Sequence, residues 1–262
     1  MKANTNGIDT YYELHGKGDA PWLVLSHSLA CSVRMWDPQI EALKDSYRLL
    51  AYDTRGHGAS GAPKGEYTLE LLADDLKALL DTLGIENPHY CGLSMGGMIG
   101  QTFALKYPGV LRTLALADTT SKYPAEAWPT WQQRIGIAEE KGMQPLVQPT
   151  LERWFTEPFR KAHPGPVEAI GKLIAATPVA GYVGCCHAIP KINLTGRLKE
   201  IKTPILVLCG EQDPGTPPAM AKEIHENAPG SKLVMIPQAA HLSNLEKPAE
   251  FTRALREFLA VH

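Results

Sequence analysis

The chain is predicted to be an α/β protein with a mostly parallel sheet that is covered by helices on both faces. Short apolar runs typical of buried strands alternate with amphipathic helical stretches along its 262 residues. Such alternation is the signature of parallel strands joined by crossover helices. The alternation stops at residue 121 and resumes at 196. We therefore expect a core formed by residues 1–120 and 196–262, with residues 121–195 inserted as a helical cap.

In the first half of the chain, short apolar runs predict strands, and apolar residues that recur every three or four positions predict helices. Residues 8–14 alternate in polarity and read as an edge strand, whereas the other expected strands are almost wholly apolar. Leucines three or four residues apart define one face of a helix from 69 to 83. Further strands are expected at 22–26, 48–52, 88–91 and 114–117, and further helices near 37–42 and over 95–107, where Pro108 ends the pattern.

The second half begins with the expected cap and returns to strands afterwards. Residues 121–195 are helical in pattern, interrupted by nine prolines, and rich in tryptophan. Apolar runs at 205–209 and 232–236 then read as buried strands, and an amphipathic helix over 251–259 closes the chain. A cap inserted at this place would lie over the carboxyl ends of the strands, where open α/β sheets hold their sites.

Composition excludes several classes of function. The net charge is −2 and no basic block occurs, so neither nucleic acid nor an anionic membrane is an expected partner. No apolar run is long enough for a signal segment or a membrane span. The five cysteines form no C-x-x-C pair, which favours reduced thiols in the cytoplasm. No metal-ligand cluster, phosphate-binding loop or dinucleotide fingerprint is present, so we expect neither a metal nor a cofactor.

The segment from Gly92 to Gly96 reads G-x-S-x-G and stands between an expected strand and an expected helix. In that context the motif forms a sharp turn that presents the central serine as a nucleophile. The flanking glycines lack a Cβ, so the backbone tolerates the strained turn and a substrate can approach closely. Ser94 is therefore the predicted nucleophile.

A serine hydroxyl needs a base, and the base needs an acid that orients it. Asp213 follows the strand at 205–209, and His241 follows the strand at 232–236. This order of serine, acid and histidine is the one that the turn motif predicts. Asp118, after the strand at 114–117, is the rival acid. We favour Asp213 because its strand should lie next to the strand that precedes His241, and His187 in the cap is a distant rival for the base.

Two backbone N–H groups are expected to bind the oxyanion of an acyl-transfer intermediate. One is that of Met95, which follows the nucleophile at the amino end of a helix. The other is that of Leu29, in the loop after the strand at 22–26. His27 opens the same loop and is expected to support it through hydrogen bonds rather than to catalyse.

The chain resembles the 3-oxoadipate enol-lactonases, a group of α/β-hydrolases that act in the degradation of aromatic compounds. The similarity runs along nearly the whole chain, through segments 92–97, 151–156, 181–189, 213–218 and 240–244. Two places depart from the family's pattern and bear on substrate identity: His27 and the segment 118–120. The resemblance implies a serine hydrolase of the α/β-hydrolase fold that opens an enol-lactone.

The resemblance also implies a small anionic substrate, whose carboxylate needs a cationic partner in the cap. Arg134, Arg153 and Arg160 are candidates. We favour Arg134, because Trp131 and Arg134 share one helical face, so that Trp131 would form a wall of the pocket while Arg134 binds the acid.

Other functions remain open at this stage. The nearest is a carboxylesterase or another lactonase that uses the same triad on neutral esters. A perhydrolase, a carbon–carbon hydrolase or a ligand receptor of the same fold is a weaker alternative.

Overall fold

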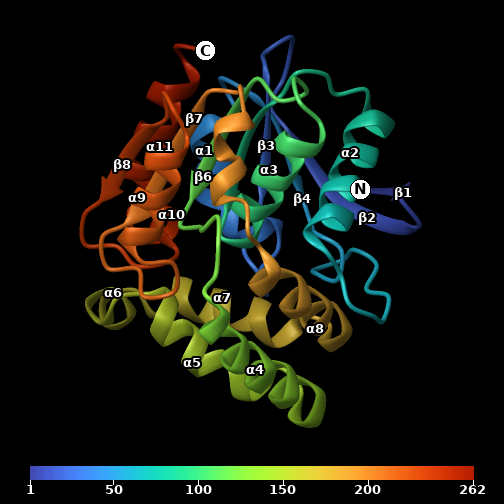
Figure 1. Cartoon of the computed structure of the whole chain (residues 1–262), viewed down its shortest axis with the longest axis vertical. Coiled ribbons are helices and arrows are strands. Elements are labelled where there is room, and N and C mark those ends of the chain that lie inside the picture. The colour runs from blue at the N-terminus through green and yellow to red at the C-terminus, as the bar shows by residue number, and fades with distance from the viewer.

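An eight-stranded sheet runs through the centre of the structure, a computed structural model that describes residues 1–262 (Figure 1). The strand order is β1-β2-β4-β3-β5-β6-β7-β8, and only the pairings of β2 with β1 and β4 are antiparallel. The strands are β1 (Lys2–Thr5), β2 (Ile8–His15), β3 (Trp22–Ser26), β4 (Arg48–Tyr52), β5 (His89–Leu93), β6 (Thr113–Ala117), β7 (Ile205–Gly210) and β8 (Lys232–Ile236). The predicted α/β class with a mostly parallel sheet is confirmed.

The helices of the sheet-containing body follow the expected alternation and cover both faces of the sheet. One group packs through α2 against α3, and another through α1 against α11. These helices are α1 (Asp37–Leu43), α2 (Leu69–Leu83), α3 (Met95–Lys106), α9 (Pro218–Asn227), α10 (Ser243–Glu246) and α11 (Pro248–Leu259), with short 3₁₀ turns η1 (Val33–Trp36) and η4 (Thr195–Glu200). Every residue of β5, β6 and β7 is buried, because helices cover these strands on both sides.

Strand β1 was not predicted from the sequence. It pairs with β2 through a two-residue turn at Asn6 and Gly7, both of which have positive φ angles of 48° and 80°. An Asn-Gly pair is the strongest short-range signal for such a hairpin. The signal is present in the sequence, where Asn6 and Gly7 stand directly before the expected strand at 8–14.

Five helices separate β6 from β7 and gather beyond one end of the strands, below the sheet in Figure 1. They are α4 (Trp128–Lys141), α5 (Gln144–Trp154), α6 (Glu157–Ala162), α7 (Pro164–Ala176) and α8 (Val179–Ala188), with the 3₁₀ turns η2 (Ala125–Ala127) and η3 (Ile189–Lys191). Four of these helices carry a proline in their first turn, where its missing N–H removes no hydrogen bond. Many of the prolines therefore mark helix starts.

The two ends of this inserted segment leave the body side by side. Lys122 and Asn193 form an isolated antiparallel bridge, and Ser121 Oγ lies 2.7 Å from Thr195 Oγ1. The inserted helices are not separately packed, since one cluster of 72 buried apolar residues includes Trp131 and Trp154 together with the strands of the sheet. The insertion and the body therefore share a single hydrophobic core.

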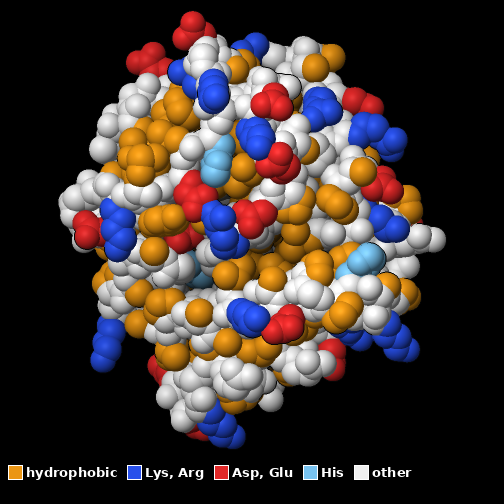
Figure 2. Space-filling model, turned by 180° about the vertical axis from the view of Figure 1, so that it is seen from behind, with side chains coloured by type: hydrophobic (Ala, Val, Ile, Leu, Met, Phe, Trp, Pro, Cys, Tyr) orange, Lys and Arg blue, Asp and Glu red, His pale blue; other side chains and the backbone are white.

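The face of the molecule in Figure 2 carries both signs of charge. Figure 2 shows lysines, arginines and acids interspersed over one face, with apolar side chains gathered along the seam between the body and the inserted helices. No single helix has the length and apolar character to cross a membrane; α7 and the following segment Val179–Lys191 pass that test only as a pair bent by 93°.

Helix α8 meets the loop after β4 at two glycines that touch through their backbones. A Cβ on Gly181 would lie 2.0 Å from the carbonyl oxygen of Gly56, and Gly56 itself has φ +83°. No side chain could give way at this contact, because both partners are backbone.

We predict that Gly181→Ala lowers the free energy of unfolding by about 1–3 kcal/mol, because the insertion must move away from the body. Gly136→Ala is the matched control: Gly136 also lies within a helix of the insertion, but nothing stands within 4 Å of its Cβ position. That variant should be neutral or stabilising by up to about 1 kcal/mol. Urea unfolding measures both, and equal effects of the two substitutions would contradict the packing described.

Candidate functional site

Ser94 occupies a strained turn between β5 and α3. Its φ is +56°, a region that residues with a Cβ seldom adopt. The two motif glycines are needed for space: a Cβ on Gly92 would lie 2.3 Å from the carbonyl oxygen of Gly96, and one on Gly96 would lie 2.2 Å from that of Ser26. Thr119 also holds the turn, because its Oγ1 donates a 2.7 Å hydrogen bond to the Ser94 carbonyl.

His241 and Asp213 meet at the carboxyl edge of the sheet. Nδ1 of His241 lies 2.8 Å from Oδ2 of Asp213, and both side chains are almost fully buried. The Asp213 carboxylate also accepts hydrogen bonds from the backbone N–H groups of Gly215 (2.7 Å) and Thr216 (3.1 Å) and from the Thr216 hydroxyl (2.7 Å). Burial alone would raise the pKa of Asp213, but His241 and the hydrogen bonds from Thr216 lower it overall. The residue is thus an ionised acceptor for His241.

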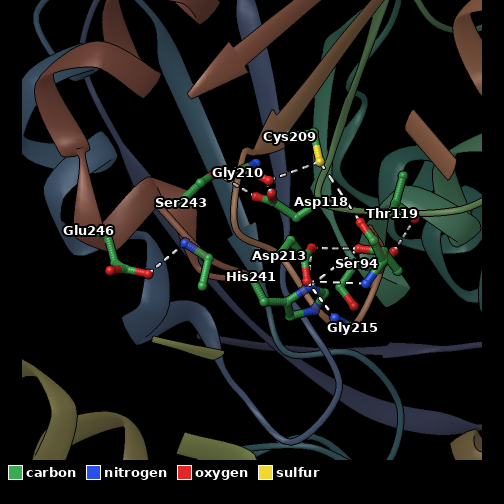
Figure 3. Close-up of polar contacts among 12 residues, drawn as sticks. Ser94, Asp118, Thr119, Cys209, Gly210, Asp213, Gly215, His241, Ser243 and Glu246 are labelled. Carbon is green, nitrogen blue, oxygen red and sulfur yellow. Dashed lines mark hydrogen bonds and ion pairs between the residues drawn. The ribbon is translucent and has the colours of Figure 1, made fainter. Parts of the chain in front are cut away.

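Ser94 and His241 line one cavity together with Gly215 (Figure 3). The structure therefore brings together the three residues that the sequence analysis selected as nucleophile, base and acid. His187, the distant rival, lies outside this cavity, where Nδ1 is 3.5 Å from Glu66.

Asp118 lies close to Asp213 but makes no bond to the histidine. Its Oδ1 accepts the N–H of Gly210 at 2.7 Å, and its Oδ2 lies 2.5 Å from the Ser243 hydroxyl (Figure 3). Complete burial and the charge of Asp213 raise the pKa of Asp118 well above its usual value. This carboxyl group links β6, β7 and the loop of His241. It does not contact the imidazole ring, which Asp213 contacts instead.

Asp118, Cys209 and Asp213 bring three potential metal-ligand atoms within 4.8 Å of one another. The set is poorly suited to a cation, because protein donors already bind the carboxylate oxygens. Burial also raises the pKa of the Cys209 thiol, whereas metals bind the thiolate. These contacts fit a hydrogen-bonded cluster better than a metal centre.

Two neutral histidines fix the loop after β3. The carbonyl of Ser28 accepts hydrogen bonds from His27 Nδ1 at 2.7 Å and from the N–H of Cys31 at 3.2 Å. The N–H of Ala30, a residue with φ +57°, donates to His57 Nε2 at 2.9 Å. The peptide groups on both sides of Leu29 are therefore held by imidazole rings.

The first of these peptide groups determines where the N–H of Leu29 points. A trans peptide directs its N–H opposite to its C=O, so anchoring the Ser28 carbonyl orients the N–H of Leu29 away from His27. That N–H has no hydrogen-bond partner in the protein, and Leu29 lines the cavity. The N–H of Met95, the first residue of α3, is likewise free at the positive end of the helix.

Both histidines accept a backbone N–H, which requires the neutral ring. His27 Nε2 accepts the N–H of Thr54 at 2.9 Å, in addition to the bond that its Nδ1 donates. Burial lowers the pKa of His27 to about 4, and burial together with the neighbouring His27 lowers that of His57 to about 3. His27 thus supports the loop through hydrogen bonds, as expected from the sequence.

Helices of the insertion form the other wall of the cavity. The space measures about 180 Å³ and is lined by Trp131, Arg134, Arg153, Trp154 and Tyr182, among others. The guanidinium of Arg134 lies 4.7 Å from the ring centroid of Trp131. Arg160, the third candidate, does not line the cavity; it donates to the carbonyls of Glu152 and Phe155 instead.

Tyr123, Thr150 and Tyr182 also line the cavity and were not predicted as site residues. Tyr182 lies in the segment 181–189 that carries the family resemblance, whereas no motif marks Tyr123 or Thr150, which reach the cavity only through the packing of the inserted segment.

Comparison with known proteins agrees with the geometry. Residues 21–248 match the family described as alpha/beta hydrolase fold. The chain is 38% identical to 3-oxoadipate enol-lactonase 2 of Acinetobacter baylyi, over 93% of this chain and 90% of that protein. The crystal structure of the enol-lactonase from Burkholderia xenovorans LB400 superposes with a TM-score of 0.96 at 37% identity, over 99% and 100% of the two chains. A malate-bound thermophilic esterase from Thermogutta terrifontis superposes at 0.93 with 31% identity, over 99% and 97%.

The buried histidine pair predicts a loss of stability in mild acid. The unfolded chain takes up a proton on each ring near pH 6.5, whereas the folded chain resists it to about pH 4 and 3. The free energy of unfolding should therefore fall as the pH drops below about 6.5, by about 2 kcal/mol per histidine between pH 7 and pH 5.

Urea unfolding at the two pH values measures this fall. His57→Gln keeps an acceptor for the N–H of Ala30 but cannot take up a proton, so it should remove about half of the contribution of the pair. His163→Gln, at an exposed position, serves as the control. An unchanged fall in His57→Gln would show that the ring is not held neutral.

Proposed function

The chain belongs to the α/β-hydrolase fold family, is a hydrolase of carboxylic ester or lactone bonds, and, we propose, opens 3-oxoadipate enol-lactone with water to give 3-oxoadipate. One observation carries the proposal: the 2.8 Å contact of His241 with Asp213 in the cavity that Ser94 lines. The 38% identity to an enol-lactonase supports the choice of substrate. We place the reaction in the degradation of aromatic compounds in the cytoplasm, where five free, buried thiols would stay reduced.

In the proposed mechanism Ser94 attacks the lactone carbonyl while His241 takes the proton of its hydroxyl. Asp213 accepts a hydrogen bond from Nδ1, which leaves Nε2 as the basic nitrogen and stabilises the imidazolium that forms. The low pKa of Asp213 supports this role, because the group stays ionised throughout. A protonated carboxyl group could not stabilise the imidazolium in the same way.

The oxyanion of the tetrahedral intermediate binds to the N–H groups of Leu29 and Met95. Both groups are free of protein partners, so they need no rearrangement to receive the negative charge. The two histidines that hold the peptides on either side of Leu29 support this assignment, because a preoriented donor stabilises developing charge better than a mobile one.

The ring oxygen leaves as an enolate, which takes up the proton carried by His241 and becomes a ketone, so its departure needs little assistance and the imidazole is neutral again. Water then attacks the acyl-enzyme, with His241 as the base, and releases the carboxylic acid. We propose that residues 121–195 act as a cap that encloses this chemistry and limits the access of bulk water, while residues 1–120 and 196–262 form the catalytic body.

The substrate carboxylate is proposed to bind Arg134, with Trp131 as a wall of the pocket. The guanidinium of Arg134 stacks on Trp131 and makes no ion pair, which leaves its N–H donors available. Burying a carboxylate without such a partner would be costly.

Hydrolysis of a neutral ester by the same residues is the second candidate, supported by the 31% identity to a thermophilic esterase. The triad and the oxyanion donors contact only the scissile group, so they would serve either substrate. The two functions differ in whether the cap residues contribute to binding.

Ser94→Ala is predicted to lose turnover of the enol-lactone by about a millionfold. Ser231→Ala, which removes a hydroxyl group outside the cavity, should leave turnover unchanged. Ultraviolet absorbance follows the opening of the lactone, and p-nitrophenyl acetate reports activity on a neutral ester. More than about one per cent residual turnover in Ser94→Ala would remove Ser94 as the nucleophile. A higher kcat/KM for the neutral ester than for the lactone would instead favour the esterase.

The two buried aspartates are predicted to respond differently to the same substitution. Asp213→Asn should lower kcat by about 10⁴-fold, because the amide cannot stabilise the imidazolium. Asp118→Asn should change kcat by less than about tenfold, since Asp118 does not contact His241 and an amide of the same shape can still accept the N–H of Gly210. Steady-state kinetics at pH 7 decide between them, and a larger loss in Asp118→Asn would reverse the assignment of the acid.

A further inference from the structure

The cavity at Ser94 carries two positive charges and no negative one. Of its seventeen lining residues, Arg134 and Arg153 are the only arginines, and none is an aspartate or glutamate. Neither arginine makes a hydrogen bond or an ion pair with the protein. By contrast, Arg160, just outside the cavity, is bound to two backbone carbonyls.

Arg153 is in an unfavourable position for a lone cation. Burial lowers the pKa of its guanidinium, and the positive charge of Arg134 lowers it further. Removing a charge from water without a partner costs free energy, and a neighbouring like charge adds to that cost. The pair therefore favours an anionic occupant of the cavity more strongly than one arginine alone would.

The two arginines lie on different helices of the cap. Arg134 belongs to α4, where it stacks on Trp131. Arg153 lies at the end of α5, directly before Trp154, whose ring is 5.9 Å from that of His241. The carbonyl of Trp154 also accepts the N–H of Leu242 at 3.1 Å, which ties this end of α5 to the loop of the base. Arg153 thus lines the cavity from a helix end that is tied to the loop of His241.

We propose that Arg134 and Arg153 together bind two carboxylate groups, so that the cavity takes a short dicarboxylate. The inference rests on the proposed function. Hydrolysis breaks the ring C–O bond of the lactone, adds the hydroxyl group of water to the carbonyl carbon and the other hydrogen of water to the released enolate, which becomes a ketone. The new acid then releases one proton. A substrate with one carboxylate thereby becomes a product with two.

The charge of the bound ligand determines how many of the two arginines are neutralised. With a monoanionic substrate one of the two arginines keeps an unpaired charge, whereas a dianion neutralises both. The dianionic product and other short dicarboxylates therefore bind more tightly than monoanions of the same length and compete with the substrate. A cavity of about 180 Å³ restricts the occupant to a small molecule.

The test compares adipate with hexanoate, which have the same six carbons but two carboxylates against one. Titration calorimetry at pH 7 should show adipate binding the wild-type protein about 10- to 100-fold more tightly than hexanoate. Arg153→Met keeps the apolar stem but removes the charge, and should bring the ratio close to one. Arg153→Lys should keep part of the preference, and Arg160→Met, the matched control, should keep all of it.

Two results would overturn the inference: equal affinities of the two ligands for the wild-type protein, or an unchanged ratio in a folded Arg153→Met variant. Circular dichroism confirms folding, and Arg153→Lys tests the charge if the methionine variant does not fold. Titration of Ser94→Ala with both ligands separates the inference from the proposed function, because binding needs no turnover. Tight adipate binding without lactone hydrolysis by the wild-type protein would reject the function alone.

Discussion

The close packing of backbone around Ser94 is the constraint on which the rest of the site depends. Strand β3 and helix α3 approach so closely that Gly96 has no room for a Cβ beside the Ser26 carbonyl. This contact holds Ser94 at φ +56°, a strain of about 1–3 kcal/mol that the surrounding sheet and helix offset. Leu29 and Ser94 line the same cavity, and the free N–H of Met95 lies directly after Ser94 at the start of α3.

Chemically similar groups near that turn have their pKa values shifted in different directions by their surroundings. Asp213 receives hydrogen bonds from His241 and Thr216, which lower its pKa, whereas Asp118 lies fully buried beside it with a raised pKa. His27 and His57 stay neutral and act as acceptors for backbone N–H groups. Two environments that differ over a few ångströms thus shift the pKa values of two neighbouring carboxyl groups in opposite directions.

The inserted helices are joined to the loop of His241 by more than apolar contact. The buried Glu246 carboxylate accepts the N–H of Ala240 at 2.8 Å and the hydroxyl of Thr156 at 2.6 Å, so one side chain binds the residue before His241 and the start of α6. Trp154 contacts the same loop. The position of His241 is therefore fixed relative to the wall of the cavity that carries Arg153. The proposed base and the proposed substrate-binding wall are therefore structurally linked.

The sequence by itself determined the fold class and the residues of the proposed triad, because both depend on short-range patterns. Alternating strands and helices predict a parallel sheet, and a serine between two glycines at a strand end predicts the turn. Only the tertiary structure shows that Asp213 and not Asp118 contacts His241, that Arg153 lines the cavity and that Arg160 does not. These outcomes depend on side-chain direction and on packing between helices far apart in the chain, which local periodicity does not encode.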